Sequence, residues 1–326
     1  GSGESFYLCA VELPSNIPVV DYGEEPTFFK QWQMLVHPDM IENDLFKVAA
    51  KVDREAVRVI PTASSRTVMM TDPDGWFLKL CYRGVIGRND RQLKSEHAIS
   101  AIEVSTAISS STDANILPHD IYLLREVFSR VAMLPDHESV YEWGIVLREP
   151  SPYPRNPRIK VMIPAFALFS RDEKNPDDPT LLTQLIKNQN KTVEDFMAED
   201  VICPVYRAYF ELLLSCGLQI EAHAQNILFA LDEKYSVIGV IVRDAESIDK
   251  DFSLMSDLGL HNSFTDLQYK RLLRQQYNYS IMHSFMFDFK LGEYLVDPII
   301  KDAVNNFSVN TSALTERIRV HNKAYI

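Results

Sequence analysis

The sequence predicts an α+β fold, with short strands in the first half and helices around one β-hairpin in the second. Two observations carry this prediction. Apolar residues occur in short β-rich runs separated by turn residues before about residue 90, whereas several later segments repeat them every three or four positions. With 326 residues, 46% of them hydrophobic, the chain can bury a large core, and its length suggests about two domains.

The first half is expected to start as an antiparallel sheet. Short runs rich in β-forming residues lie at 56–60, 66–70 and 76–82, and Pro73-Asp74-Gly75 supplies a turn between the last two. Further along the chain, helical spacing predicts helices at 95–108 and 119–134, followed by strands at 142–147 and 160–168. The first half is therefore predicted to be mixed α+β.

Two polar stretches, 149–158 and 171–179, have the Pro-rich and charged composition of linkers. We therefore predict a first domain at 1–150, a connecting segment at 151–190 and a second domain at 191–326.

The second half is predicted to open with a helix at 205–217, which Gly217 would cap. The run 218–244 then reads as a short extended segment, a tight loop and a hairpin that turns at 232–234, and helices return from about 264 to the end. The aromatic and Met residues of 277–294 are expected in a helix core rather than around a ligand.

Composition excludes several classes of protein. A formal net charge of −12 disfavours a surface built for nucleic acid or an acidic membrane. The four cysteines lack metal-ligand spacing and do not suggest a disulfide framework, so a reducing cytoplasm is expected. No apolar run approaches the roughly 18 to 20 residues that span a bilayer, and there is no charged-then-apolar leader.

Polar residues gather at the two ends of the predicted hairpin. His223 and Asn226 lie just before its first strand, and Arg243-Asp244 closes the second, so strand pairing would bring Asn226 near Asp244. An amide oxygen and a carboxylate suit Mg²⁺, and kinase-like folds place their metal ligands in this way. The alternative is that these residues only cap a loop or pair locally.

The first half supplies cations. Lys79 would share a strand face with Phe77 and Cys81, where it would be out of place unless it met an anion. With Arg66 and Arg91 it could hold a triphosphate beside a carboxylate. The alternative is an edge strand guarded by a lysine and two surface arginines.

P-loop, dinucleotide-binding, nucleophile-elbow and zinc-protease motifs are all missing from the sequence. The chemistry that remains for this sequence is the binding of nucleotides and anions.

Four blocks in this order resemble the siderophore synthetases that are independent of non-ribosomal peptide synthetases, the aerobactin synthetase-like family. The resemblance covers roughly residues 25 to 310. The blocks are Ser64-Ser65-Arg66-Thr67, Phe77-Leu78-Lys79-Leu80, Arg91 twelve residues after Lys79, and Glu221, His223, Gln225 and Asn226 with Arg243-Asp244 about twenty residues later.

This resemblance implies a "fingers" region of mixed or antiparallel sheet and a kinase-like, helix-rich "palm" that carries the hairpin. It implies ATP and Mg²⁺ as cofactors, with the following roles. ATP would contact Ser64, Arg66, Thr67, Lys79, His223, Asn226 and Asp244; the substrate acid would contact Ser64, Arg91 and His223; Mg²⁺ would bind Asn226, Asp244 and Glu221; and Arg66, Lys79, Arg91 and His223 would be catalytic.

The implied reaction activates a small carboxylic acid, such as citrate or a related acid, by adenylation and condenses it with an amine, releasing AMP and pyrophosphate. The implied setting is siderophore or related metabolite biosynthesis, in a homodimer.

The beginning of the chain departs from the family. Where the family often reads His-Pro-Trp-Gln, this sequence has Lys30-Gln31-Trp32-Gln33, and His37-Pro38 is expected to be loop structure. The family's N-terminal "thumb" is thus expected to be largely missing, and the acid pocket incomplete, reshaped or completed by a partner subunit.

Two other functions stay open at this point. A kinase-like small-molecule phosphotransferase fits the order of His, Asn, hairpin and Asp, although Gln225 stands where its Asp base is expected. A non-catalytic subunit of a split synthetase would bind ATP without turnover.

Overall fold

The computed structural model describes residues 4–260, 264, 283–323 and 325, except for 43, 65, 73–74, 87–88 and 137–138. Contacts divide the chain into two compact units, one made of residues 1–106 and 124–151 and the other of residues 107–123 and 152–326. The second unit thus includes residues that precede the predicted limit at 150, as well as all but the first residue of the predicted connecting segment 151–190. Each unit is described by itself.

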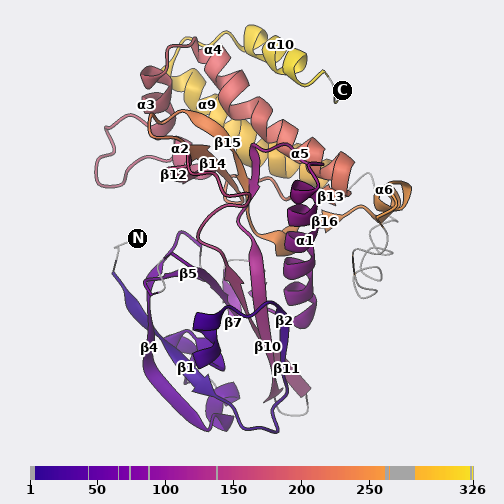
Figure 1. Cartoon of the computed structure of the whole chain (residues 1–326). Coiled ribbons are helices and arrows are strands. Elements are labelled where there is room, and N and C mark those ends of the chain that lie inside the picture. The colour runs from indigo at the N-terminus through magenta and orange to yellow at the C-terminus, as the bar shows by residue number, and fades with distance from the viewer. Residues whose placement is uncertain are drawn as a thin grey trace. The chain divides into compact units, whose positions relative to one another are not determined.

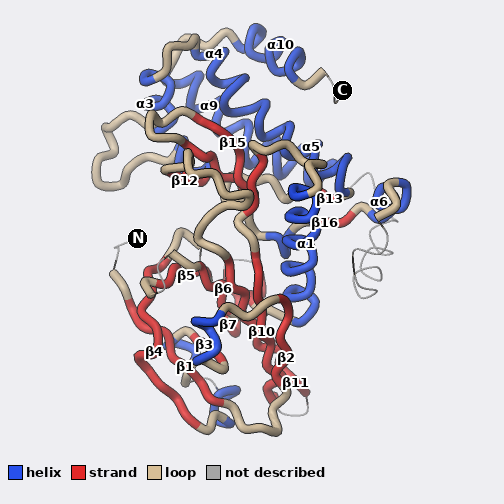
Figure 2. The backbone as a smooth tube through the Cα atoms, in the orientation of Figure 1, coloured by secondary structure: helices blue, strands red, loops and turns tan. Residues whose placement is uncertain are grey.

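An eight-stranded antiparallel sheet forms the frame of the first unit (Figure 2). Its order is β2-β10-β11-β6-β5-β4-β1-β3. The strands are β1 (Phe6–Glu12), β2 (Val19–Gly23), β3 (Met34–Val36), β4 (Lys51–Pro61), β5 (Thr67–Met70), β6 (Phe77–Leu80), β10 (Glu126–Asp136) and β11 (Ser139–Arg148). Three 3-10 turns, η1 (Thr27–Gln31), η2 (Pro38–Met40) and η3 (Asp44–Val48), and the strand pair β7 (Tyr82–Ile86) and β8 (Asn89–Arg91) complete the connections.

The predicted hairpin of the first half is confirmed. Strands β5 and β6 pair antiparallel, although residues 73 and 74 of the predicted turn lie outside the described residues. Leu78 and Leu80 of β6 belong to a large apolar cluster, together with the fully buried Phe29, Phe128 and Trp143. Because side chains alternate along a strand, Lys79 faces the other side of the sheet.

The predicted helix at 95–108 is confirmed as α1 (Ser95–Asp113). Where it runs within the first unit, α1 packs on the sheet, and the backbone N–H of Glu126 donates to Ser105 Oγ at 3.0 Å.

The predicted helix at 119–134 is wrong, because β9 (Ile121–Leu123) and β10 occupy this stretch. Both faces of β10 are covered, and residues 128–132 are all buried. A strand buried on both faces does not alternate apolar with polar residues, so its apolar spacing can imitate a helical stripe.

The second unit combines a small mixed sheet with helices (Figure 1). The sheet has the order β12-β14-β15-β9, in which β15 runs parallel to β9. Its other strands are β12 (Val161–Pro164), β14 (Ile227–Leu231) and β15 (Val237–Val242), and β13 (Leu218–Gln219) pairs separately with β16 (Asp249–Lys250). The helices are α2 (Ala165–Phe169), α3 (Leu181–Asn188), α4 (Val193–Asp195), η4 (Phe196–Ile202), α5 (Cys203–Cys216), η5 (Ala245–Ser247), α6 (Phe252–Asp257), η7 (Phe285–Val296), α9 (Asp297–Asn306) and α10 (Thr311–His321), of which η4 and η7 are π-helices and η5 is a 3-10 turn.

Two predictions for this unit are confirmed. Gly217 ends α5 in the left-handed conformation at φ 66°, as a glycine C-cap does. Strands β14 and β15 form the predicted hairpin, with Asp232 Oδ1 accepting from the backbone N–H groups of Lys234 and Ser236 in the turn.

The predicted strand at 160–168 is correct only for its first part, because α2 begins at Ala165. Pro164 has no N–H to continue the strand ladder, and the Ala and Leu residues after it favour a helix. The helices predicted from 264 onward are confirmed for 285–321, while residues 265–282 lie outside the described residues.

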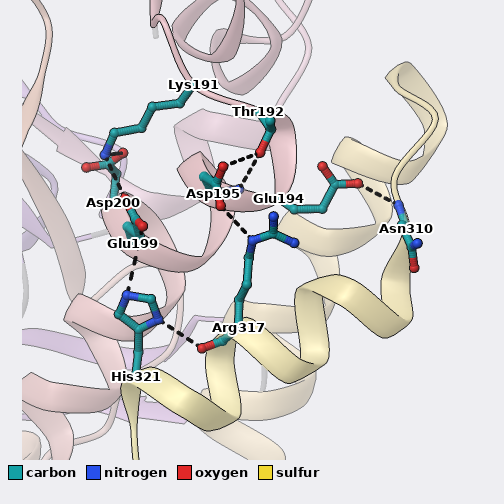
Figure 3. A network of polar contacts seen from close by, with 9 residues as sticks. All are labelled: Lys191, Thr192, Glu194, Asp195, Glu199, Asp200, Asn310, Arg317 and His321. Carbon is teal, nitrogen blue, oxygen red and sulfur yellow. Dashed lines mark hydrogen bonds and ion pairs between the residues drawn. The ribbon is translucent and has the colours of Figure 1, made fainter.

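The C-terminal helix α10 lies beside α4 and η4. Figure 3 shows the polar contacts that fasten it: Arg317 Nε donates to Asp195 Oδ1 at 2.6 Å, and the Asn310 N–H donates to Glu194 at 2.7 Å. His321 Nε2 lies 3.9 Å from Glu199, which also pairs with Lys191. These contacts join two segments more than a hundred residues apart.

Within the described part of the chain, no helix combines the length and the apolar character that crossing a lipid bilayer requires.

Candidate functional site

Thr67 and Lys79 lie directly opposite each other on neighbouring strands of the first unit. Each is only 6% exposed, and Val146 of β11 is the next residue in the same row. A lysine buried this deeply stands beside a threonine hydroxyl, which can donate to a phosphate oxygen. The strand register therefore places two of the predicted phosphate contacts side by side.

Arg66 joins this pair to Arg91. The carbonyl oxygen of Arg66 accepts from the Leu80 N–H at 2.8 Å, and its Nη1 donates to the Arg91 carbonyl oxygen at 3.0 Å. Both arginines are half-buried, and Ser64 lies in the loop before β5, where its N–H donates to Thr62 Oγ1. The first unit thus brings the backbones of Arg66, Thr67, Lys79 and Arg91 close together, with Ser64 in the loop that precedes them.

The hairpin brings the predicted residues of the second unit together. Ile227 pairs with Val242, and the Arg243 N–H donates to the Asn226 carbonyl oxygen at 3.1 Å. Ser247 then bridges the two candidate metal ligands: Asn226 Nδ2 donates to its Oγ at 3.3 Å, and that hydroxyl donates to the Asp244 carbonyl oxygen at 2.8 Å. The expected proximity of Asn226 and Asp244 is confirmed.

Asp244 adopts the left-handed backbone conformation, at φ 69°. This region is costly for a residue other than glycine, although aspartate tolerates it better than most, and such strain concentrates at functional sites. Strand β15 ends two residues earlier, at Val242, and the 3-10 turn η5 begins at the residue after Asp244.

His223 lies in the loop before β14, where its ring accepts a hydrogen bond from the backbone. Its Nδ1 accepts from the Gln225 N–H at 3.2 Å, so the proton of the neutral ring is on Nε2, which lies 3.7 Å from Glu221 Oε2. Burial lowers the pKa of His223 below its ordinary value; the Glu221 carboxylate opposes this effect, and the Lys290 ammonium adds to it.

Glu221 makes a second and closer contact. Lys290 Nζ lies 2.5 Å from Glu221 Oε1, and each of these side chains is about one-fifth exposed. Glu221 therefore engages Lys290 with one oxygen and faces His223 with the other, which leaves it poorly placed as a metal ligand. Its predicted metal role stays a prediction.

The sequence reasoning missed Lys290 and Ser247. Ser247 carries a local signal, since a serine hydroxyl three residues after Asp244 can bond back to that residue's carbonyl. Lys290 lies 69 positions after Glu221 in a segment of helical character, and nothing in its own neighbourhood points to this contact.

Within the described ranges, no group of three or more His, Cys, Asp or Glu side chains is arranged to hold a metal ion. Asn226 and Asp244 still fit Mg²⁺, which in nucleotide sites is bound by one or two protein oxygens and completed by phosphates and water. Because the Asn226 amide nitrogen is turned to Ser247, its carboxamide oxygen is the atom that would bind a metal.

Residues 30–33, which replace the family's His-Pro-Trp-Gln, line a cavity of about 1040 Å³ in the first unit. Arg130 also lines it, and all five of its N–H groups are used by Asp21, Glu25 and the carbonyl oxygens of residues 32 and 33. Arg130 is therefore committed to the fold and has no donor left for an acid. His37-Pro38, expected to be a loop, begins the 3-10 turn η2.

Searches by sequence found neither a matching family model nor a matching curated protein. Solved structures do match. ATP-bound aerobactin synthetase IucA of Klebsiella pneumoniae is 14% identical, with a TM-score of 0.70 over 98% of this chain and 62% of its own. Aerobactin synthetase IucC of the same organism is 15% identical, with a TM-score of 0.72 over 99% and 63%.

The petrobactin biosynthesis protein AsbB of Bacillus anthracis is 16% identical, with a TM-score of 0.66 over 90% of this chain and 52% of its own. The resemblance inferred from the sequence motifs is thus confirmed at the level of the fold. The chain spans between one-half and two-thirds of the length of these synthetases.

Proposed function

We propose that the chain is an ATP-dependent carboxylate–amine ligase that activates a small carboxylic acid as an acyl-adenylate. The observation that carries the proposal is the end of the hairpin, where Asn226 and Asp244 lie together beside His223. The fold likeness to an ATP-bound synthetase supports it.

Asn226 and Asp244 would hold Mg²⁺, and the ion would neutralise phosphate charge when bound. Arg66, Thr67 and Lys79 would contact the phosphates of ATP, since a guanidinium binds phosphate bidentately and an ammonium acts as a point charge. Arg91 would bind the substrate carboxylate, with Ser64 beside it. His223 would donate its Nε2 proton to an oxygen on which charge develops.

The reaction requires no nucleophilic side chain. A carboxylate oxygen attacks the α-phosphorus of ATP, and the bond to pyrophosphate breaks. The amine nitrogen then attacks the acyl carbon, the bond to AMP breaks, and the amine loses a proton. Binding both reactants in line contributes by proximity, and the cations stabilise the phosphorane-like charge.

Citrate or a related acid, a siderophore-type product, a cytoplasmic location and a homodimer belong to the same proposal. The cytoplasmic location rests on the cysteine content, and the others rest on the motif resemblance described above.

A kinase-like transfer of the γ-phosphoryl group is the second candidate, favoured by the hairpin with an Asn before it and an Asp after it. Gln225 argues against it, because a carboxamide cannot accept a proton as an aspartate base does.

The decisive experiment is a panel of carboxylic acids with Mg-ATP and hydroxylamine. The products AMP, pyrophosphate and hydroxamate are measured together. Formation of all three with one acid is the expected result. ADP with phosphorylated product would establish the kinase instead, and bound but unconsumed ATP with every acid would indicate the non-catalytic subunit.

A further inference from the structure

The predicted residues of the second unit carry an unfavourable charge for binding a triphosphate. Glu221 and Asp244 are acidic, and Asn226 carries no charge. A bound metal ion would offset the negative charge of Asp244. Glu221 is poorly placed to bind that ion, so its charge needs another cation. A carboxylate near phosphate repels it unless a cation compensates.

Lys290 is placed to provide that compensation. Its Nζ is 2.5 Å from Glu221 Oε1 and 5.1 Å from the centre of the Phe285 ring, so the ammonium is held between a carboxylate and an aromatic face. At about one-fifth exposure, the pair is shielded enough for its Coulomb energy to matter more than in a surface ion pair.

The π-helix η7 sets the position of this lysine. Its buried residues are Met286, Leu291, Leu295 and Val296, separated by five and then by four or five positions, a spacing that matches hydrogen bonds five residues apart. Phe285, Lys290 and Tyr294 repeat with the same spacing on another side of the helix. The Tyr294 carbonyl oxygen accepts from the Ala224 N–H at 3.2 Å, which ties the same helix to the His223 loop a second time.

We infer that Lys290 is a positioning residue of the nucleotide site, whose ammonium neutralises Glu221 and holds that carboxylate in place, so that it does not act as a metal ligand. This inference depends on the proposed function.

The test compares full-length variants by calorimetric titration with Mg-ATP. Lys290→Gln is expected to weaken binding about tenfold, because it leaves the Glu221 charge uncompensated beside the phosphates. Lys290→Arg is expected to retain binding. The double variant Glu221→Gln with Lys290→Gln is expected to regain most of the affinity for Mg-ATP that Lys290→Gln loses, since both charges are removed. Lys301→Gln, an exposed position on α9, is the matched control and should bind as the wild type does.

Two results of the binding titrations would overturn the inference but not the proposed function. One is that Lys290→Gln binds Mg-ATP as tightly as a wild type that binds it. The other is that the double variant binds worse than Lys290→Gln, as expected if Glu221 is a metal ligand. Urea unfolding without nucleotide provides an independent reading, on a double-mutant cycle made of the wild type, Glu221→Gln, Lys290→Gln and the double variant. Absence of coupling between positions 221 and 290 would also overturn it. A wild-type chain that does not bind Mg-ATP would overturn the proposed function, and the inference with it.

Discussion

Asp244 combines a strained backbone with a predicted metal-binding carboxylate, and the two can be separated by substitution. Glycine adopts φ 69° without steric cost, so Asp244→Gly should change the free energy of unfolding by no more than about 1 kcal/mol. Mg-ATP binding should nevertheless be lost. Tyr235, at φ 59° and 54% exposed in the hairpin turn, offers the matched control Tyr235→Gly, which should keep binding. Equal binding by both variants would remove Asp244 from the site.

Glu126 and Arg148 form a buried ion pair in the first unit, at 2.6 Å with side chains 0% and 6% exposed. Arg148→Met should lower the free energy of unfolding by about 3–5 kcal/mol, because it leaves a buried carboxylate without its cation. Adding Glu126→Leu should recover most of that loss. Urea denaturation measures both changes, and a single variant as stable as the wild type would contradict the expectation.

At this scale, the sequence predicts a contact only where its two residues are separated by few residues along the chain. Asn226 and Asp244 were predicted to meet because one hairpin of predictable register separates them. The pair Thr67 and Lys79 is likewise a product of a local hairpin. Lys290 meets Glu221 only through the packing of η7 on the loop at 221–226, and no local pattern encodes such a contact.

At the scale of elements, the wrong predictions of secondary structure also arise from tertiary packing, which no local pattern encodes. Strand β10 is buried on both faces, so its residues do not alternate between apolar and polar, and the sequence pattern predicts a helix instead. That burial is a tertiary property. Helix α1 and helix α5 were predicted correctly, since α1 carries its own apolar stripe and α5 adds a terminal glycine in Gly217.

The attachment of α10 should depend on pH. The Thr192 hydroxyl, and then Arg317, hold the pKa of Asp195 below its ordinary value. A carboxyl whose pKa is lower in the folded than in the unfolded state stabilises the folded state at pH values above its unfolded pKa. This stabilisation is lost as the pH falls through the folded pKa. Protection of α10 amides from hydrogen exchange, corrected for intrinsic rates, should therefore decrease on acidification.

Asp195→Asn should remove much of that pH dependence. Glu316, whose pKa is also lowered by its pairing with Arg319 within α10, supplies the control Glu316→Gln. If Glu316→Gln flattened the profile and Asp195→Asn did not, the contact with Asp195 would not be what fastens the helix.

At the scale of the whole molecule, the predicted chemistry draws on residues from both units. The cations Arg66 and Lys79 belong to the first unit, and the candidate metal ligands belong to the second. If one reaction uses both sets, Arg66→Ala and Asn226→Ala should each reduce pyrophosphate release by about 10²–10³-fold, the usual cost of removing one group that stabilises transition-state charge. Circular dichroism and urea unfolding should show that both variants stay folded.

The double variant distinguishes cooperation from independent effects. Residues that act on one transition state are strongly non-additive, so Arg66→Ala with Asn226→Ala should be little slower than either single variant. Arg58→Ala, a cation of strand β4 outside the candidate set, is the control and should turn over normally. Full activity in Arg66→Ala, with activity lost in Asn226→Ala, would confine the chemistry to the second unit and leave the candidate cations of the first with a structural role.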